Sequence, residues 1–98
     1  MHARMTKFTA KPDQIDGLTE YYRNTVLPEA RKLDGFKGGV ALTNRETGES
    51  VSFTLWESEE ALRASEEAGN RLRGRAASDL ELSEPTVERY EVGVLEIS

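Results

Sequence analysis

Few side chains in this sequence have the types and spacing that catalysis or metal binding requires. The 98 residues include no cysteine and a single histidine, His2. Thiolate chemistry, disulfides and metals held by sulfur are therefore excluded, and a lone histidine near the first residue predicts a solvated side chain. No serine, histidine and acid combine into a triad, and Gly38 and Gly39 lack the following helix of a phosphate-binding loop. We expect no metal site and neither hydrolase nor nucleotide chemistry.

Tyr22 is the residue whose position best suits a chemical role. Apolar residues three and four positions apart predict a helix from Asp13 to Leu33, which Pro28 should bend near Asn24 without ending it. Its inner positions are Ile15, Leu18, Tyr22, Val26, Ala30 and Leu33. Tyr22 lies near the centre of this arc, so its ring should point inward and its hydroxyl needs a partner. Most buried tyrosines are core residues with a bonded hydroxyl, and that alternative stays open beside a catalytic role.

The charge balance excludes several classes of partner. Thirteen Lys and Arg against eighteen Asp and Glu give a net charge of −5, which would repel a phosphate backbone, so we expect no nucleic acid. The cluster Arg71, Arg73 and Arg75 is typical of a helix C-terminus, with an anion site as the less favoured alternative. No apolar stretch is long enough to cross a membrane. The absence of cysteine and of an apolar leader predicts a cytoplasmic protein.

The elements that must position these residues follow the order strand, helix, strand, strand, helix, strand. Strand patterns cover residues 2–10, 36–44 and 50–56, and the connector between the last two predicts a hairpin. A fourth strand is expected after Pro85, with a bulge at Gly93 where the alternation changes phase.

The second helix is predicted to start after Ser58, whose hydroxyl suits an N-cap. Its inner residues are small, so it could lie close to the sheet or leave room beside it. They are Ala61, Ser65, Ala68, Leu72 and Ala76. Gly35 should end the first helix in a left-handed conformation.

Alternation in the third strand divides its side chains between two faces. Phe53 shares one face with Val51 and Leu55, and we expect this face to form the core under the helices. Thr54 and Trp56 would then lie on the uncovered face. An indole is poorly placed in open solvent, so we predict that Thr54 and Trp56 form the interface of a face-to-face homodimer.

This order of elements is that of the split βαβ, or ferredoxin-like, arrangement. It is an α+β fold (βαββαβ) in which a four-stranded antiparallel sheet carries both helices on one face. The length predicts a single domain over residues 1–98.

Three segments carry a resemblance to a known family. They are VLPEARKLDGFKGG at the end of the first helix, TGE in the hairpin and LWESEEALRAS after the third strand. From about Arg4 to Val94, the chain resembles the antibiotic biosynthesis monooxygenase-like proteins of the dimeric α+β barrel superfamily. The resemblance implies a homodimer whose two sheets pack into a barrel. It also implies a ligand cavity between sheet and helices in each protomer.

Members of this family carry out several reactions or have none known, and our enzyme hypothesis is cofactor-independent oxidation of a small aromatic or quinol compound. Tyr22 would orient this substrate, and an arginine such as Arg71 would lie near the mouth of the cavity. The predicted cavity wall consists of Phe53, Ser65 and Leu72. The competing hypothesis is a non-catalytic dimer that binds a small apolar ligand or acts as a stress or regulatory accessory. A cavity on the scale of about 300 Å³ would favour a ligand-binding role.

Heme degradation is not expected. Relatives with that activity use an asparagine in the first strand, then a tryptophan and a histidine on the second helix. The corresponding positions here hold Met5 and Thr6, then Ser65, then Arg75. The sequence therefore offers no axial ligand, and no cofactor is predicted.

Overall fold

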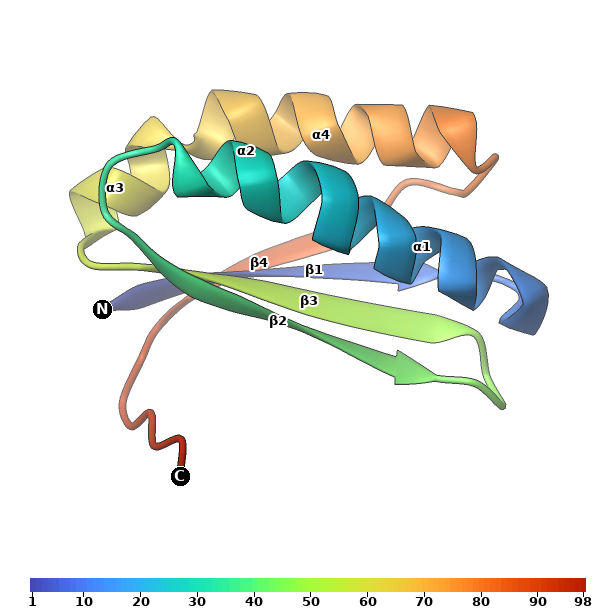
Figure 1. Cartoon of the computed structure of the whole chain (residues 1–98), viewed down its shortest axis with the longest axis horizontal. Coiled ribbons are helices and arrows are strands. Elements are labelled where there is room, and N and C mark those ends of the chain that lie inside the picture. Colours follow the sequence, from blue (N-terminus) through green and yellow to red (C-terminus); the bar gives the residue numbers. More distant parts are fainter.

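Four antiparallel strands form one sheet in the computed structural model, which describes residues 1–98 (Figure 1). The strands are β1 (His2–Thr9), β2 (Phe36–Asn44), β3 (Glu49–Trp56) and β4 (Thr86–Glu91), in the order β2-β3-β1-β4. All helices lie on one face of this sheet and leave the other face bare (Figure 1). The predicted ferredoxin-like α+β fold is confirmed. None of the helices combines the length and the apolar character needed to cross a bilayer.

The first helical segment is continuous and bent, as predicted. A 3-10 turn (Pro12–Gln14) leads into α1 (Ile15–Tyr21), a π-helical turn η2 (Tyr22–Val26) and α2 (Leu27–Arg31). The π turn includes Asn24, whose carbonyl group would bond to residue 28 in a regular helix, where Pro28 has no N–H to donate. The segment therefore passes the proline without ending.

The second helical segment is two helices rather than the expected one. Ser58 is the predicted cap, since its Oγ accepts a hydrogen bond from the Ala61 N–H at 3.1 Å. Helix α3 (Glu59–Ala64) ends at Ser65, and α4 (Glu66–Asp79) begins directly after it. The Ser65 hydroxyl donates to the Leu62 carbonyl oxygen at 2.6 Å and so satisfies a main-chain group at the break.

The fourth strand is shorter than its sequence pattern predicts. It ends at Glu91, which pairs with His2 at the start of β1. Val92 still donates to the Met1 main-chain oxygen at 2.9 Å, and the residues that follow pair with no strand of the sheet. Gly93 therefore hosts no bulge, and Leu95 and Ile97 are exposed outside the sheet. The bulge of this sheet lies in β2, between Phe36 and Gly38.

The two faces of the sheet are the reverse of the predicted assignment. Thr54 and Trp56 lie under the helices, and Trp56 is only 1% exposed. Its indole packs with Ala30 and Leu62 and meets the Phe36 ring edge-on at 5.4 Å between ring centroids. The prediction that Thr54 and Trp56 form a dimer interface is therefore wrong, because the helices of the same chain already cover the indole.

The uncovered face carries the apolar set of β3. Phe53 and its neighbours of the same parity, Val51 and Leu55, point to this side and pair with β2 residues of the same face. Among these partners, Val40 is 44% exposed and Leu42 is 54% exposed. The bare face is thus the more apolar one, and the face under the helices is the more polar one.

Candidate functional site

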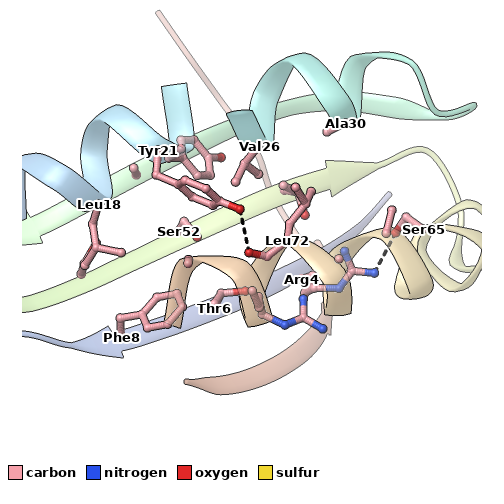
Figure 2. A pocket seen from close by; sticks show the side chains of 18 of the residues that line it. Arg4, Thr6, Phe8, Leu18, Tyr21, Val26, Ala30, Ser52, Ser65 and Leu72 are labelled. Carbon is pink, nitrogen blue, oxygen red and sulfur yellow. Dashed lines mark hydrogen bonds between the residues drawn. The ribbon is translucent and has the colours of Figure 1, made fainter. Parts of the chain in front are cut away.

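A cavity divides the core between the sheet and the helices. At one end Phe8, Leu18 and Ala76 form a small buried cluster, and at the other end Ala30, Trp56 and Leu62 form a second one. Residues of both clusters line the space between them (Figure 2). The small inner residues of α4 leave this room beside the sheet, which was one of the two outcomes expected for them.

The cavity is partly open to solvent. Its volume is about 80 Å³ when only the centres of water-sized molecules are counted, and about 800 Å³ of space is free of protein atoms once the open mouth is included. Ligand sites in proteins commonly measure about 300–1,000 Å³. The comparable value of about 80 Å³ lies below this range and below the about 300 Å³ set as the criterion for a ligand site, so a ligand with two or three rings must also occupy the open mouth.

The cavity wall is apolar on the helix side and polar on the sheet side. Twelve of its 20 lining residues are hydrophobic, and most of these belong to the helices. Ser50, Ser52 and Thr54 of β3 contribute hydroxyl groups from the sheet. The Thr54 hydroxyl accepts a hydrogen bond from the Trp56 indole N–H at 3.1 Å. An aromatic molecule could therefore contact apolar groups on one side and hydrogen-bonding groups on the other.

Tyr22 lines the cavity, and its hydroxyl donates to the main-chain oxygen of Phe53 at 2.7 Å. Burial raises the pKa of Tyr22 to about 12. The hydroxyl is therefore neutral near pH 7, and the Val40 main chain lies close enough to its oxygen to donate a hydrogen bond. A side chain at Gly39 would block this arrangement, since a Cβ there would lie 2.2 Å from the Tyr22 Oη.

Tyr21 also reaches the cavity, although it is not among the predicted inner positions of the first helix. Its hydroxyl donates to the Leu72 carbonyl oxygen at 2.9 Å and joins α1 to α4 across the cavity (Figure 2). Burial raises the pKa of Tyr21 as well. Both tyrosine side chains in the site are thus neutral, and each hydroxyl already donates its proton in a hydrogen bond to a main-chain oxygen.

The structure brings together part of the predicted cavity wall. Ser65 and Leu72 line the cavity with Tyr22, as helical spacing indicated. Phe53 does not, and its prediction as a lining residue is wrong because its side chain belongs to the uncovered face; only its main-chain oxygen takes part, through Tyr22. Arg71 is exposed and absent from the wall, and Arg73 of the same helix lies there instead.

Arg4 is a lining residue that the sequence did not reveal. It lies on β1, is only 4% exposed, and lines the cavity. Its Nη2 donates to the Leu62 carbonyl oxygen at 3.0 Å and to the Ser65 Oγ at 2.7 Å (Figure 2). The signal was present in the alternation of Arg4, Thr6 and Phe8 along one face of the first strand, but a charged residue in an irregular strand pattern did not suggest burial.

Glu66 at the start of α4 is the acidic partner of Arg4. Its Oε1 lies 3.1 Å from the Arg4 Nη2, and Arg89 of β4 donates to its two oxygens at 2.6 Å each. Hydrogen bonds from Arg89, and then from Arg4, lower the pKa of Glu66 to about 2 despite partial burial. The carboxylate is therefore ionised at any pH at which the protein would act.

His2 does not take part in the site. Its Nε2 lies 3.8 Å from a Glu59 oxygen, and its Nδ1 is buried without a partner, so it is less solvated than predicted. No three side chains among His, Cys, Asp and Glu gather closely enough to hold a metal ion.

Comparison with known proteins places the chain in a family. The family model described as antibiotic biosynthesis monooxygenase matches residues 1–77. The chain belongs to the antibiotic biosynthesis monooxygenase family. This membership confirms the resemblance drawn from the three sequence segments.

Solved structures of other proteins share this fold. The monooxygenase from the gene ActVA-Orf6 of Streptomyces coelicolor, in complex with nanaomycin D, matches 99% of this chain and 92% of its own, with a TM-score of 0.76 and 21% identity. SnoaB, a cofactor-independent oxygenase from Streptomyces nogalater, matches 96% of this chain and 94% of its own, with a TM-score of 0.68 and 17% identity. At these identities the likeness shows the fold alone.

Curated relatives in sequence are two uncharacterised proteins of Mycobacterium tuberculosis. They are 30% and 32% identical over 95 residues, which is 97% of this chain. The chain spans only 42% and 40% of their lengths. The match therefore supports the family.

Proposed function

We propose that this protein binds a small aromatic or quinol compound in its cavity and oxidises it with molecular oxygen, without a cofactor. The observation that carries the proposal is the cavity itself, which has an apolar helix side and a hydroxyl-lined sheet side. Membership of the antibiotic biosynthesis monooxygenase family supports the same class of reaction.

The reaction needs little chemistry from the side chains. An acidic aromatic substrate loses a proton, and its carbanion or phenolate supplies electrons to oxygen. In an anthrone-type substrate, one oxygen atom of O₂ replaces two hydrogens as a carbonyl group and the other leaves as water. In a quinol, two electrons and two protons pass to O₂, which gives the quinone and hydrogen peroxide. The protein contributes binding, orientation and stabilisation of the substrate anion.

Tyr22 is proposed to orient the substrate. Its proton is held by the Phe53 main-chain oxygen, so its own oxygen can accept a hydrogen bond from a substrate hydroxyl. A pKa of about 12 makes it a poor general acid or base near pH 7. Ser65 and Leu72 are proposed to contact the ligand from α4, and Trp56 to close the far end of the cavity.

The bare face of the sheet is proposed to bind a second copy of the chain. Val51, Phe53 and Leu55 lie on this face of β3, and Val40 and Leu42 of β2 extend it with exposed apolar groups. A flat face of this kind on one side of a sheet commonly packs against another sheet. A homodimer would cover it and leave the cavity of each protomer intact on the helix side.

Oxygen uptake with a panel of quinols and anthrones tests the proposed reaction. The native protein should raise uptake above the buffer rate, and product should fail to form under anaerobic conditions. Ala68→Leu fills the cavity from α4 and should abolish the effect, whereas Ala64→Leu on the exposed side of α3 should not. An uptake equal to buffer across the panel would refute catalysis and favour the non-catalytic ligand-binding or accessory role.

A further inference from the structure

Two guanidinium groups meet over Gly69 at one end of the cavity. A Cβ on Gly69 would lie 3.1 Å from the Arg4 Nη1 and 3.0 Å from the Arg73 Nη1. Because both atoms lie about 3 Å from one point, they are no more than about 6 Å apart. Arg4, Gly69 and Arg73 all line the cavity. The missing side chain of Gly69 lets the two guanidinium groups approach the helix main chain at this point.

Positive charge exceeds negative charge at this end of the cavity. Arg4, Arg73 and Arg89 surround a single carboxylate, Glu66, and Arg89 already occupies both of its oxygens. Arg73 has no acidic partner within ion-pair distance and donates only to the amide oxygen of Asn70. The chain as a whole carries a net charge of −5, so the local charge here is opposite in sign to the net charge of the protein. Burial, followed by the charge of Arg4, lowers the pKa of Arg73.

Arg4 also retains unused hydrogen-bond donors. Its contacts with Leu62, Ser65 and Glu66 all involve Nη2, and its Nε is buried without any partner. A buried donor of a charged group that lacks an acceptor is costly, and native structures rarely keep one without a reason. The Nε–H lies on the same edge of the guanidinium as Nη2, so an anion on the Arg73 side would instead use Nη1, which makes no hydrogen bond in the protein.

We propose that the space between Arg4 and Arg73 binds the carboxylate of an aromatic acid, with the ring of that acid against the apolar helix side. Two planar guanidinium groups that approach from β1 and from α4 suit a group with two equivalent oxygens. A phenolate would offer one oxygen to two cations. The inference deepens the proposed function by naming the substrate class, and it rests on that function only in treating the cavity as the ligand site.

Binding of 2-naphthoate and its neutral isostere 2-naphthamide, followed by titration calorimetry, tests the site. We expect 2-naphthoate to bind at least about tenfold more tightly than the amide, in line with charged hydrogen bonds. Arg73→Gln should remove most of this preference and leave amide binding unchanged. Arg75→Gln, an exposed arginine of the same helix outside the wall, is the matched control and should change neither.

Three results would overturn the assignment. They are equal affinity for acid and amide, an acid preference that survives Arg73→Gln, and binding of 2-naphthol as tight as that of 2-naphthoate. The last would replace the carboxylate with a phenolate. Naphthoate binding without oxygen uptake on any substrate would refute the proposed oxidation and support this site. Turnover of neutral quinols without naphthoate binding would support the oxidation and refute this site.

Gly69→Ala tests the same space without changing any charge. The added methyl group would lie within 3.1 Å of both guanidinium groups, whose flexible ends must shift to admit it. Alanine is the better helix former, so the thermal midpoint should stay the same or rise. We expect naphthoate affinity to fall several-fold in this folded variant, and unchanged affinity would contradict a ligand seated over Gly69.

Discussion

The two faces of the sheet show opposite relations between polarity and burial. The face under the helices carries Ser50, Ser52 and Thr54 from β3, and it borders a cavity that is partly open to solvent. The opposite face carries Val51, Phe53 and Leu55, and no element of the chain covers it (Figure 1). Hydroxyl groups suit a wall that meets water or ligand, and apolar groups suit a wall that meets another protein. On this strand, polarity does not follow depth in the monomer.

Trp56 is the exception on the inner face, and its removal should have the largest effect. Trp56→Ala deletes a side chain that is 1% exposed and packed between α2 and α3. Truncation of a buried tryptophan costs about 3–5 kcal/mol, so we expect a loss of that size in the free energy of unfolding by urea denaturation. Leu42→Ala on the bare face, compared at the same protein concentration, should cost much less. Equal losses would mean that the two faces are equally buried.

A charge on the bare face should separate the proposed dimer. Leu42→Asp changes a side chain that is 54% exposed in the monomer, so the monomer should still fold. In a dimer the new carboxylate would be buried without a partner, so the variant should not dimerise. Sedimentation should give about twice 11.0 kDa for the native chain and 11.0 kDa for the variant. Arg71→Asp on the exposed side of α4 is the control and should remain dimeric. A native mass of one chain would refute the proposed use of this face.

Loss of Glu66 should destabilise the inner face by a smaller amount that depends on pH. The pKa of Glu66 in the folded protein is about 2, below the ordinary value of 4.5. Its contribution to the free energy of unfolding is therefore fully present above about pH 4.5 and is lost as the pH falls toward 2. Glu66→Gln should therefore cost about 1–2 kcal/mol near pH 7, allowing for partial exposure, and almost nothing near pH 2.

Urea denaturation at several pH values measures this dependence. Glu67→Gln, an exposed neighbour on the same helix, is the matched control and should give a difference that does not change in this range. A Glu66→Gln penalty that stays constant down to pH 2 would contradict the assigned ion pairs.

The smallest expected effect concerns Tyr22, whose hydroxyl contacts the main chain of a residue with its side chain on the bare face. Tyr22→Phe removes the hydrogen bond to the Phe53 main-chain oxygen, and the loss should be about 1 kcal/mol. Oxygen uptake should fall by more than this loss of stability explains if the Tyr22 oxygen orients the substrate. Tyr90→Phe, an exposed tyrosine of β4, should leave both quantities unchanged. If oxygen uptake is unaltered in Tyr22→Phe, the hydroxyl does not orient the substrate and Tyr22 has only a structural role.

The fold was predictable because its signals are local. The hydroxyl of Ser58 caps α3, Gly35 adopts a φ of +83° after the first helix, and helical spacing placed Ser65 and Leu72 on one side of the second segment. Each of these depends on residues within a few positions along the chain. The order of elements then limits the topology to few arrangements.

The inner wall of the site was predictable only in part, because alternation in a strand does not say which face is inward. The rule that apolar residues lie under the helices failed for Phe53, which lies on the bare face, but it held for Trp56, which the alternation had assigned to the opposite face. Arg4 was missed because its burial depends on Ser65 and Glu66, which follow it by about sixty residues. Contacts over such separations leave no periodic signal in the sequence.

One surplus residue in the turn Tyr22–Val26 sets the direction of the helix that follows it. A π turn closes on the fifth residue instead of the fourth, whereas each residue of a regular helix rotates the next by about 100°. Deleting one residue here would therefore rotate α2 and turn Ala30 away from Trp56. A deletion at Arg23, Asn24 or Thr25, none of which lines the cavity, would thus alter the outline of the cavity without removing any lining residue.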